Sequence, residues 1–210
     1  MITVYLIRHG EVQGNKEGPE QTYAGRTDFP LTPQGHQQAA ALEMALREID
    51  LDAIYCSSLQ RTRQTAEAVA VAHGLEIVQD AAWDELDYGD WEELTVTQIE
   101  AGWGDLWQQR QADPVYVRPP HGENYEDVWQ RLQPAWIKLL ESHTDQAVAV
   151  FAHKGTIRIL LAALLGMPLE NFKRIHSSNT GISCVQLEHA GAKPLVRYVN
   201  DTAHLALHLI

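Results

Sequence analysis

The stretch Ile2-Thr3-Val4-Tyr5-Leu6-Ile7-Arg8-His9-Gly10 lies at the start of the chain and decides its fold class. Residues 2–7 are β-branched, aromatic or aliphatic, a pattern that is typical of a buried strand. Gly10 indicates the loop that follows, so Arg8 and His9 stand at the carboxyl end of the strand. Because open α/β sheets bind their ligands at that end of the strands, we expect Arg8 and His9 to lie in a ligand site.

A second predicted strand ends in the same way. Residues 147–152 read Ala-Val-Ala-Val-Phe-Ala, and His153-Lys154-Gly155 follow directly. If the two strands are neighbours in the sheet, both imidazoles project into one crevice at its carboxyl edge. Either histidine alone is more simply an ordinary loop residue. The pair, with Arg8 beside the first, favours a shared site.

The rest of the chain alternates strands with helices. Thr32-Pro33 and Asn124 are typical helix starts, and Gly74 is typical of a helix end. The predicted strands are 2–7, 53–56, 75–78, 147–152, 182–187 and 195–199, and the predicted helices begin near residues 33, 61, 124 and 156. This pattern predicts a single domain over residues 1–210, an α/β fold with a three-layer α/β/α sandwich and a mainly parallel sheet.

Residues from about 80 to 122 differ from this pattern. They contain four tryptophans and three prolines with no clean alternation: Trp83, Trp91, Trp103, Trp107, Pro114, Pro119 and Pro120. We expect an inserted cap of loops and short helices over the active site. A base-stacking surface for nucleic acid is the weaker interpretation of these aromatic residues, given the acidic charge of the chain.

The composition excludes several classes of protein. A formal net charge of −12 disfavours binding to nucleic acid, since that affinity depends on many cations displacing counterions. The two cysteines, Cys56 and Cys184, lie far apart in the sequence and form no disulfide framework. No apolar run reaches the length of a membrane span. We therefore expect a cytoplasmic protein with no nucleic-acid or membrane partner, and a homodimer as the default assembly.

Five short motifs, in order, resemble the histidine phosphatase superfamily, the phosphoglycerate-mutase-like proteins, over nearly the whole chain. Arg-His-Gly alone is a weak signal, whereas five motifs in the right order are a strong one. The motifs are Leu6-Ile7-Arg8-His9-Gly10-Glu11 with Asn15, Gly25-Arg26-Thr27-Asp28 through Thr32 with Gly35, Ser57-Ser58-Leu59-Gln60-Arg61-Thr62 with Thr65-Ala66, Asp84 through Glu92, and Phe151-Ala152-His153-Lys154-Gly155.

The resemblance implies hydrolysis of a phosphate monoester, and the residue types suit that reaction. The uncatalysed reaction is so slow that an enzyme must supply on the order of 20 kcal/mol of transition-state stabilisation. Arg8 and Arg61 can hold phosphoryl oxygens bidentately, and Asn15 can add an amide donor. His153, if protonated, adds another positive donor. These groups would replace a metal ion, and we expect no metal and no cofactor.

His9 is the expected nucleophile, because a neutral imidazole attacks phosphorus without first losing a proton. The resemblance suggests that a backbone carbonyl fixes its tautomer. Glu85 is the expected general acid, which then activates water against the phosphohistidine. The choice of Glu85 among its acidic neighbours depends mainly on the resemblance. By the same resemblance the substrate-binding residues are Arg8, Asn15, Gly25, Arg26, Arg61, Tyr88 and Gly155. Lys154 and His204 are further candidates.

Some positions depart from the family pattern. Lys154 stands where many relatives have glycine or asparagine, and it either reaches a second anionic group of the substrate or points into water. Trp91-Glu92-Glu93 replaces Trp-Glu-Gly. His204 either lines the mouth of the pocket or is a surface residue of the tail. The histidines at 36, 73, 143, 176, 189 and 208 show no ligand spacing and are interpreted as surface or packing residues.

The sequence therefore predicts a metal-independent phosphatase for a small phosphorylated metabolite such as phosphoserine or a sugar phosphate. Three alternatives stay open. A phosphoglycerate mutase would use the same His9 and Glu85. The resemblance implies a longer insertion in mutases than the middle segment of this chain provides. A non-catalytic phosphate-binding module would lack turnover. A metal-dependent hydrolase built on the ten histidines would lose activity in EDTA.

Overall fold

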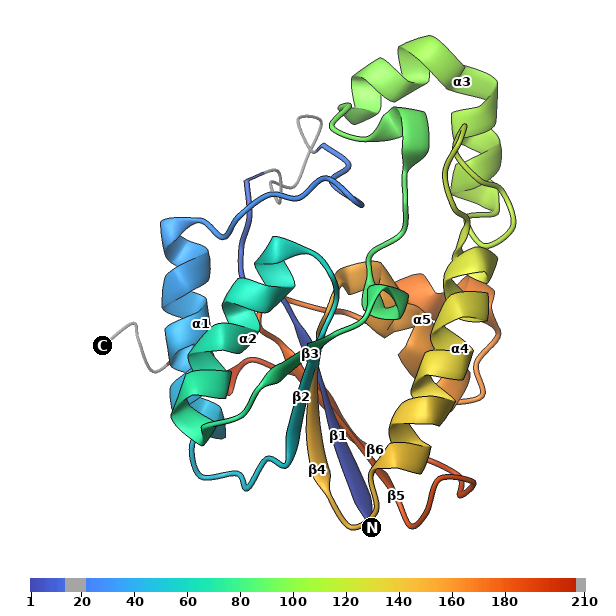
Figure 1. Ribbon diagram of the computed structural model, residues 1–210. Helices are drawn as coiled ribbons and strands as arrows, with labels where there is room; N and C mark the ends of the chain where they lie inside the picture. Colours follow the sequence, from blue (N-terminus) through green and yellow to red (C-terminus); the bar gives the residue numbers. More distant parts are fainter. Residues whose placement is uncertain (14–21, 207–210) are drawn as a thin grey trace.

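The structure is a computed structural model that describes residues 1–13 and 22–206. Its centre is a six-stranded sheet with the order β3-β2-β4-β1-β5-β6 (Figure 1). The strands are β1 (Ile2–Arg8), β2 (Ala53–Cys56), β3 (Ile77–Gln79), β4 (Ala147–Ala152), β5 (Ile182–Leu187) and β6 (Leu195–Asp201). The first four run parallel, and β5 is antiparallel to both of its neighbours. The predicted strands and the mainly parallel sheet are confirmed.

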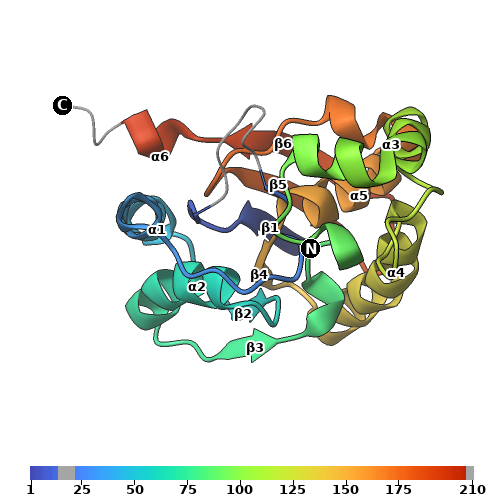
Figure 2. The same ribbon diagram turned by 90° about the horizontal axis from the view of Figure 1, so that it is seen from above.

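Helices cover both faces of the sheet (Figures 1 and 2). On one face α1 (Pro33–Leu46) and α2 (Gln60–His73) pack through an apolar cluster that includes Leu42, Ile54 and Phe151. On the other face α4 (Tyr125–Ser142) and α5 (Lys154–Leu164) bury a second cluster around Leu132 and Leu160. The three-layer α/β/α arrangement is thus confirmed. A 3₁₀ segment η3 (Leu169–Arg174) and a short α6 (Ala203–Ala206) follow.

The expected helix ends are present. Thr32 accepts a hydrogen bond from the Gly35 amide at 3.0 Å, and Pro33 begins α1. Gly74 ends α2 with a φ of 65°, a left-handed conformation that glycine adopts at no steric cost. Asn124 and Asp127 cap α4 reciprocally, each side chain accepting from the other's backbone amide.

The middle segment contains a longer helix than the sequence predicts. After η1 (Ala81–Trp83) and η2 (Gly89–Trp91), α3 (Val96–Ala112) extends over 17 residues. Trp103, with φ −140° and ψ 40°, interrupts its helical geometry, which explains why the apolar spacing is irregular. Trp91, Ile99 and Trp107 form a small core of their own. Figure 1 shows α3 on the side of the sheet where β1 and β4 end.

Within the described residues, the helices are too short or too polar to cross a membrane.

Candidate active site

His9 and His153 leave the sheet side by side. β1 pairs with β4 in parallel, with Arg8 opposite Ala152, so the next residue of each strand is a histidine. The centroids of the two rings are 5.1 Å apart. The sequence-based expectation that both imidazoles meet at one edge of the sheet is confirmed.

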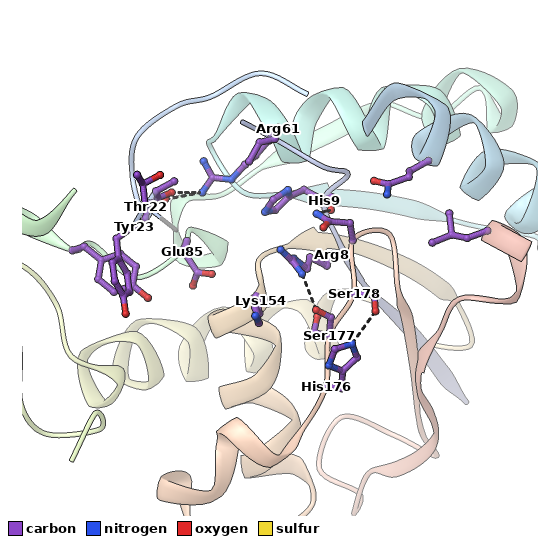
Figure 3. A pocket seen from close by; sticks show the side chains of 17 residues that line it. Arg8, His9, Thr22, Tyr23, Arg61, Glu85, Lys154, His176, Ser177 and Ser178 are labelled. Atoms are coloured by element: carbon purple, nitrogen blue, oxygen red, sulfur yellow. Dashed lines mark hydrogen bonds between the residues drawn. The ribbon is translucent and has the colours of Figure 1, made fainter. Parts of the chain in front are cut away.

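A cavity of about 360 Å³ opens beside His9 (Figure 3). Its lining comes from the end of β1, the start of α2, the segments around residues 22–25 and 85–88, the start of α5 and the loop before β5. The lining residues are Arg8, His9, Val12, Thr22, Tyr23, Ala24, Gly25, Gln38, Arg61, Glu85, Tyr88, Lys154, His176, Ser177, Ser178, Asn179 and Leu205. Six of the predicted site residues thus line the cavity with His9: Arg8, Gly25, Arg61, Glu85, Tyr88 and Lys154.

A backbone carbonyl fixes the tautomer of His9. Nδ1 of His9 lies 2.6 Å from the Gly10 carbonyl oxygen, which can only accept, so Nδ1 carries the proton. Nε2 then keeps its lone pair. Asn179 donates to the His9 carbonyl at 2.9 Å, and the Gly10 amide donates to Thr65 Oγ1 at 3.0 Å. These contacts hold the backbone on both sides of the ring.

Burial and the adjacent guanidinium groups keep the His9 ring neutral. The pKa of His9 lies well below its usual value because burial, then the positive charge of Arg61 and of Arg8, disfavours the imidazolium; the hydrogen bond to Gly10 opposes this weakly. A neutral ring with a free Nε2 lone pair is the form that can attack phosphorus.

His153 is buried and neutral as well. Arg61 Nε donates to Nδ1 of His153 at 3.2 Å, so the proton is on Nε2, which donates to Ser57 Oγ at 2.7 Å. Burial and the charge of Arg61 lower the pKa of His153 well below its usual value. The protonated form considered from the sequence therefore gives way to a neutral ring, which orients Arg61.

Arg8 and Arg61 place two guanidinium groups on the cavity. Arg8 Nη1 donates to the Ser177 carbonyl at 2.8 Å, which ties β1 to the loop before β5. Arg61 Nη1 donates to the Thr27 carbonyl at 2.8 Å and Nη2 donates to the Gly25 carbonyl at 2.6 Å. Both cations are buried among groups that hold them in place, so little ordering is needed when an anion binds.

Glu85 is held by backbone amides at the edge of the cavity. Oε1 accepts from the Leu86 amide at 3.0 Å, and Oε2 accepts from the Gly155 amide at 2.9 Å. The preceding residue, Asp84, is buried and accepts from the amide and hydroxyl of Ser58 and from Arg26. The segment that carries Glu85 is therefore fixed to the starts of both α2 and α5.

The other predicted residues take different places. Gly25 lines the cavity, and a side chain there would meet the Leu86 carbonyl oxygen. Arg26 does not line the cavity; it pairs with Asp84 at 3.0 Å and with Glu123 at 3.5 Å. Tyr88 lines the cavity, and burial raises its pKa well above the usual value, so its hydroxyl keeps its proton.

The remaining three predicted residues are Gly155, His204 and Asn15. Gly155 contributes its amide to Glu85. His204 is buried, with Nε2 3.0 Å from Thr180 Oγ1, so it is not a surface residue of the tail; its neighbour Leu205 lines the cavity. Asn15 lies outside the described residues.

Sequence reasoning missed residues 176–179 as part of the site. His176, interpreted as a surface or packing residue, lines the cavity with Ser177, Ser178 and Asn179. His176 Nε2 lies 3.1 Å from Ser178 Oγ (Figure 3). Tyr23 on the opposite wall was missed too. β5 runs antiparallel to β1, so the start of β5 lies beside the end of β1. Residues 176–179, which precede β5, are therefore next to His9.

Among the residues that the structure describes, no three His, Cys, Asp or Glu side chains are grouped so that they could hold a metal ion.

Comparison with protein families matches residues 4–202 to the histidine phosphatase superfamily, branch 1. The chain belongs to this superfamily. Phosphoserine phosphatase 1 of Hydrogenobacter thermophilus is 29% identical over 205 residues, covering 98% of this chain and 95% of that one. A Citrobacter koseri protein named "Probable phosphoglycerate mutase GpmB" is 33% identical over 211 residues, with coverage of 98% and 95%.

A solved structure is also similar over almost its full length. The alpha-ribazole phosphatase from Shigella flexneri superposes with a TM-score of 0.86 at 27% identity, covering 95% of this chain and 96% of that chain. The family resemblance drawn from the five motifs is confirmed.

Proposed function

We propose that this chain hydrolyses small phosphate monoesters through a phosphohistidine formed on Nε2 of His9. The observation that carries the proposal is the tautomer of His9: the 2.6 Å hydrogen bond from Nδ1 to the Gly10 carbonyl leaves the Nε2 lone pair free. His9 lines the cavity together with Arg8 and Arg61. Family membership and the phosphatases among the relatives make the chain a phosphatase, the enzyme class that the sequence predicts.

The reaction takes two steps. In the first, the Nε2 lone pair of His9 forms a bond to phosphorus and the bond from phosphorus to the ester oxygen breaks. Glu85 gives its proton to the departing oxygen, and Arg8 and Arg61 balance the charge on the other phosphoryl oxygens. In the second, Glu85 takes a proton from water, the water oxygen bonds to phosphorus, and the bond to Nε2 breaks. Inorganic phosphate leaves, and His9 and Glu85 regain their starting states.

The substrate class follows from the site and from the relatives. A cavity of about 360 Å³ with mostly polar lining fits a small metabolite. Relatives include enzymes named for phosphoserine and for alpha-ribazole phosphate esters. Phosphoserine or a sugar phosphate is therefore the proposed kind of substrate, with the chemistry carried by side chains and without a metal or cofactor.

The cellular location and the partners of the enzyme are proposed from its charge and its cysteines. The acidic charge disfavours nucleic acid, and the two cysteines, both free and buried, suit the reducing cytoplasm. We propose a cytoplasmic enzyme that works without a membrane partner, with the homodimer as default assembly. Residues from about 80 to 122, which include α3, are proposed to act as a cap within one domain of 210 residues.

Release of inorganic phosphate from a panel of monoesters tests the function. We expect turnover of para-nitrophenyl phosphate and of at least one small metabolite, unchanged by EDTA and abolished by His9→Ala. Loss of activity in EDTA would favour a metal-dependent hydrolase. An inactive wild-type chain that still binds phosphate would favour a phosphate-binding module.

The second candidate function is phosphoglycerate mutase, which the Citrobacter koseri relative favours. A mutase returns the phosphoryl group to the substrate, so its reaction mixture would show isomerised phosphoglycerate and no inorganic phosphate. We expect phosphate to appear at the rate at which substrate disappears.

A further inference from the structure

The segment that carries Glu85 has no regular secondary structure of its own. Residues 84–88 lie between η1 and η2 and belong to neither a helix nor a strand. The backbone groups of such a segment need partners elsewhere in the protein. Trp83 and Leu86 are buried in the same apolar cluster as Leu132 of α4, which fixes the apolar side of the segment. A general acid must also keep its place relative to the ester oxygen, so the polar side has to be fixed too.

Arg131 of α4 binds the backbone of this segment. Its Nη1 donates to the Ala82 carbonyl at 2.8 Å, and its Nη2 donates to the Glu85 carbonyl at 3.1 Å. The same guanidinium holds both carboxylate oxygens of Glu123, with Nε 3.0 Å from Oε1 and Nη2 3.1 Å from Oε2. Its planar fork of donors can serve these acceptors together, which a single ammonium group cannot do.

Glu123 extends these contacts to the other side of Glu85. Its Oε2 accepts from the Asp87 amide at 3.1 Å, and its own amide donates to the Asp87 carbonyl at 2.8 Å. Burial works against the charge of Glu123, yet the hydrogen bond and the charge of Arg131 hold its pKa below the usual value. The ion pair of Arg131 and Glu123 therefore binds the backbone at residues 82, 85 and 87, before and after the side chain of Glu85.

We propose that Arg131 is a positioning residue for the general acid: its bonds to the segment hold Glu85 where the carboxyl group reaches the departing oxygen. The inference rests on the proposed function, which gives Glu85 that role. Among the described residues that line the cavity Arg131 is not included, and its bond to Glu85 is to the backbone carbonyl. Its effect on the reaction therefore passes through Glu85, and it matters only for the proton transfers that Glu85 performs.

A double-mutant cycle with Glu85 tests this dependence. Arg131→Lys keeps the positive charge beside Glu123 but loses the fork, and Arg131→Met removes both. Each is made in the wild type and in Glu85→Gln, and kcat is measured for an alkyl phosphate and for para-nitrophenyl phosphate. Arg118→Met is the matched control, because Arg118 is exposed and pairs at 2.8 Å with Asp127 of the same helix. Urea unfolding of each variant shows that the protein assayed is folded.

We expect Arg131→Lys to lower kcat for the alkyl phosphate by about tenfold or more, as part of what general acid catalysis provides, and to lower it less for para-nitrophenyl phosphate. Arg131→Met should lose at least as much, and Arg118→Met should lose nothing. In the Glu85→Gln background the substitutions at position 131 should cost no further activity, because residues that act as a unit are not additive.

Two results would overturn the inference. Full activity of Arg131→Lys would show that charge alone matters, and equal losses from Arg131→Lys with and without Glu85 would show a general effect on the structure. The Lys variant decides between these outcomes even if Arg131→Met does not fold. Failure of the proposed function looks different, since the wild type would then release no phosphate or Glu85→Gln would leave its turnover of the alkyl phosphate unchanged.

Discussion

The backbone amide of Gly155 donates a hydrogen bond to Oε2 of Glu85 at 2.9 Å, and this contact joins the proposed general acid to the start of α5. The contact requires glycine, because a Cβ at position 155 would lie 2.5 Å from Oε1 of Glu85 and 2.9 Å from the ring of Tyr125. Position 155 therefore supplies a backbone amide to Glu85 and leaves no room for a side chain beyond hydrogen.

Gly155→Ala is expected to displace Glu85 and to slow protonation of the leaving group. We expect kcat to fall by about 10²-fold or more for alkyl phosphates, the range that general acid catalysis provides. The loss should be smaller for para-nitrophenyl phosphate, whose phenolate departs without a proton. The matched control is Gly102→Ala in α3, where a Cβ meets nothing within 4 Å. Equal losses for both kinds of substrate would show that the substitution acts on something other than Glu85.

The two buried histidines predict a pH dependence of stability. Burial and the charge of Arg61 lower the pKa values of His9 and His153 in the folded state, below the 6.5 of an unfolded chain. As pH falls below 6.5, the unfolded state binds more protons than the folded state, so the free energy of unfolding decreases until the folded-state pKa values are reached. Each histidine contributes a slope of at most about 1.4 kcal/mol per pH unit.

Urea unfolding at pH 7.5, 6.5 and 5.5 measures this effect. The wild type should lose stability between pH 6.5 and 5.5, and the double variant His9→Asn/His153→Asn should lose less over the same interval. Parallel curves for the two proteins would contradict the assignment of neutral rings.

Ser57 is predicted to fix the orientation of His153. Ser57 Oγ lies 2.7 Å from His153 Nε2 and 2.8 Å from Thr62 Oγ1, and the side chain is fully buried. Ser57→Ala leaves the Nε2 proton of His153 without an acceptor, which costs about 1–3 kcal/mol of stability. We also expect kcat to fall, because His153 orients Arg61.

Chemical denaturation and steady-state kinetics check this prediction. Ser142→Ala removes a hydroxyl at the exposed end of α4 and should change neither quantity. A Ser57→Ala protein with the stability and kcat of the wild type would show that the hydrogen bond to His153 is dispensable.

The sequence predicts the part of the site that depends on strand ends. His9 and His153 follow strands whose apolar patterns are unambiguous, and parallel pairing brings them together. The middle segment is harder to predict, because Trp103 breaks the periodicity of α3. A usable signal was present there: Thr95 and Gln98 form a capping box.

Side-chain partners are less predictable than strand ends. Arg26 belongs to a motif that favours substrate binding, yet it contacts Asp84 and Glu123, which are distant in sequence. The turn at Glu93 keeps a left-handed φ of 61° even though a glycine of the family pattern is replaced there. Neither contact geometry nor tolerated strain can be read from residue types alone, since both depend on the tertiary neighbours.

Trapping of the phosphoenzyme tests the central claim most directly. The chain is mixed rapidly with para-nitrophenyl phosphate, quenched in alkali, where phosphohistidine is stable, and digested for mass spectrometry. We predict one phosphoryl group, on His9, absent from the His9→Ala variant and present at a higher level when Glu85→Gln slows its hydrolysis. A phosphoryl group on His153 or on any other side chain, or full turnover by His9→Ala, would contradict the account.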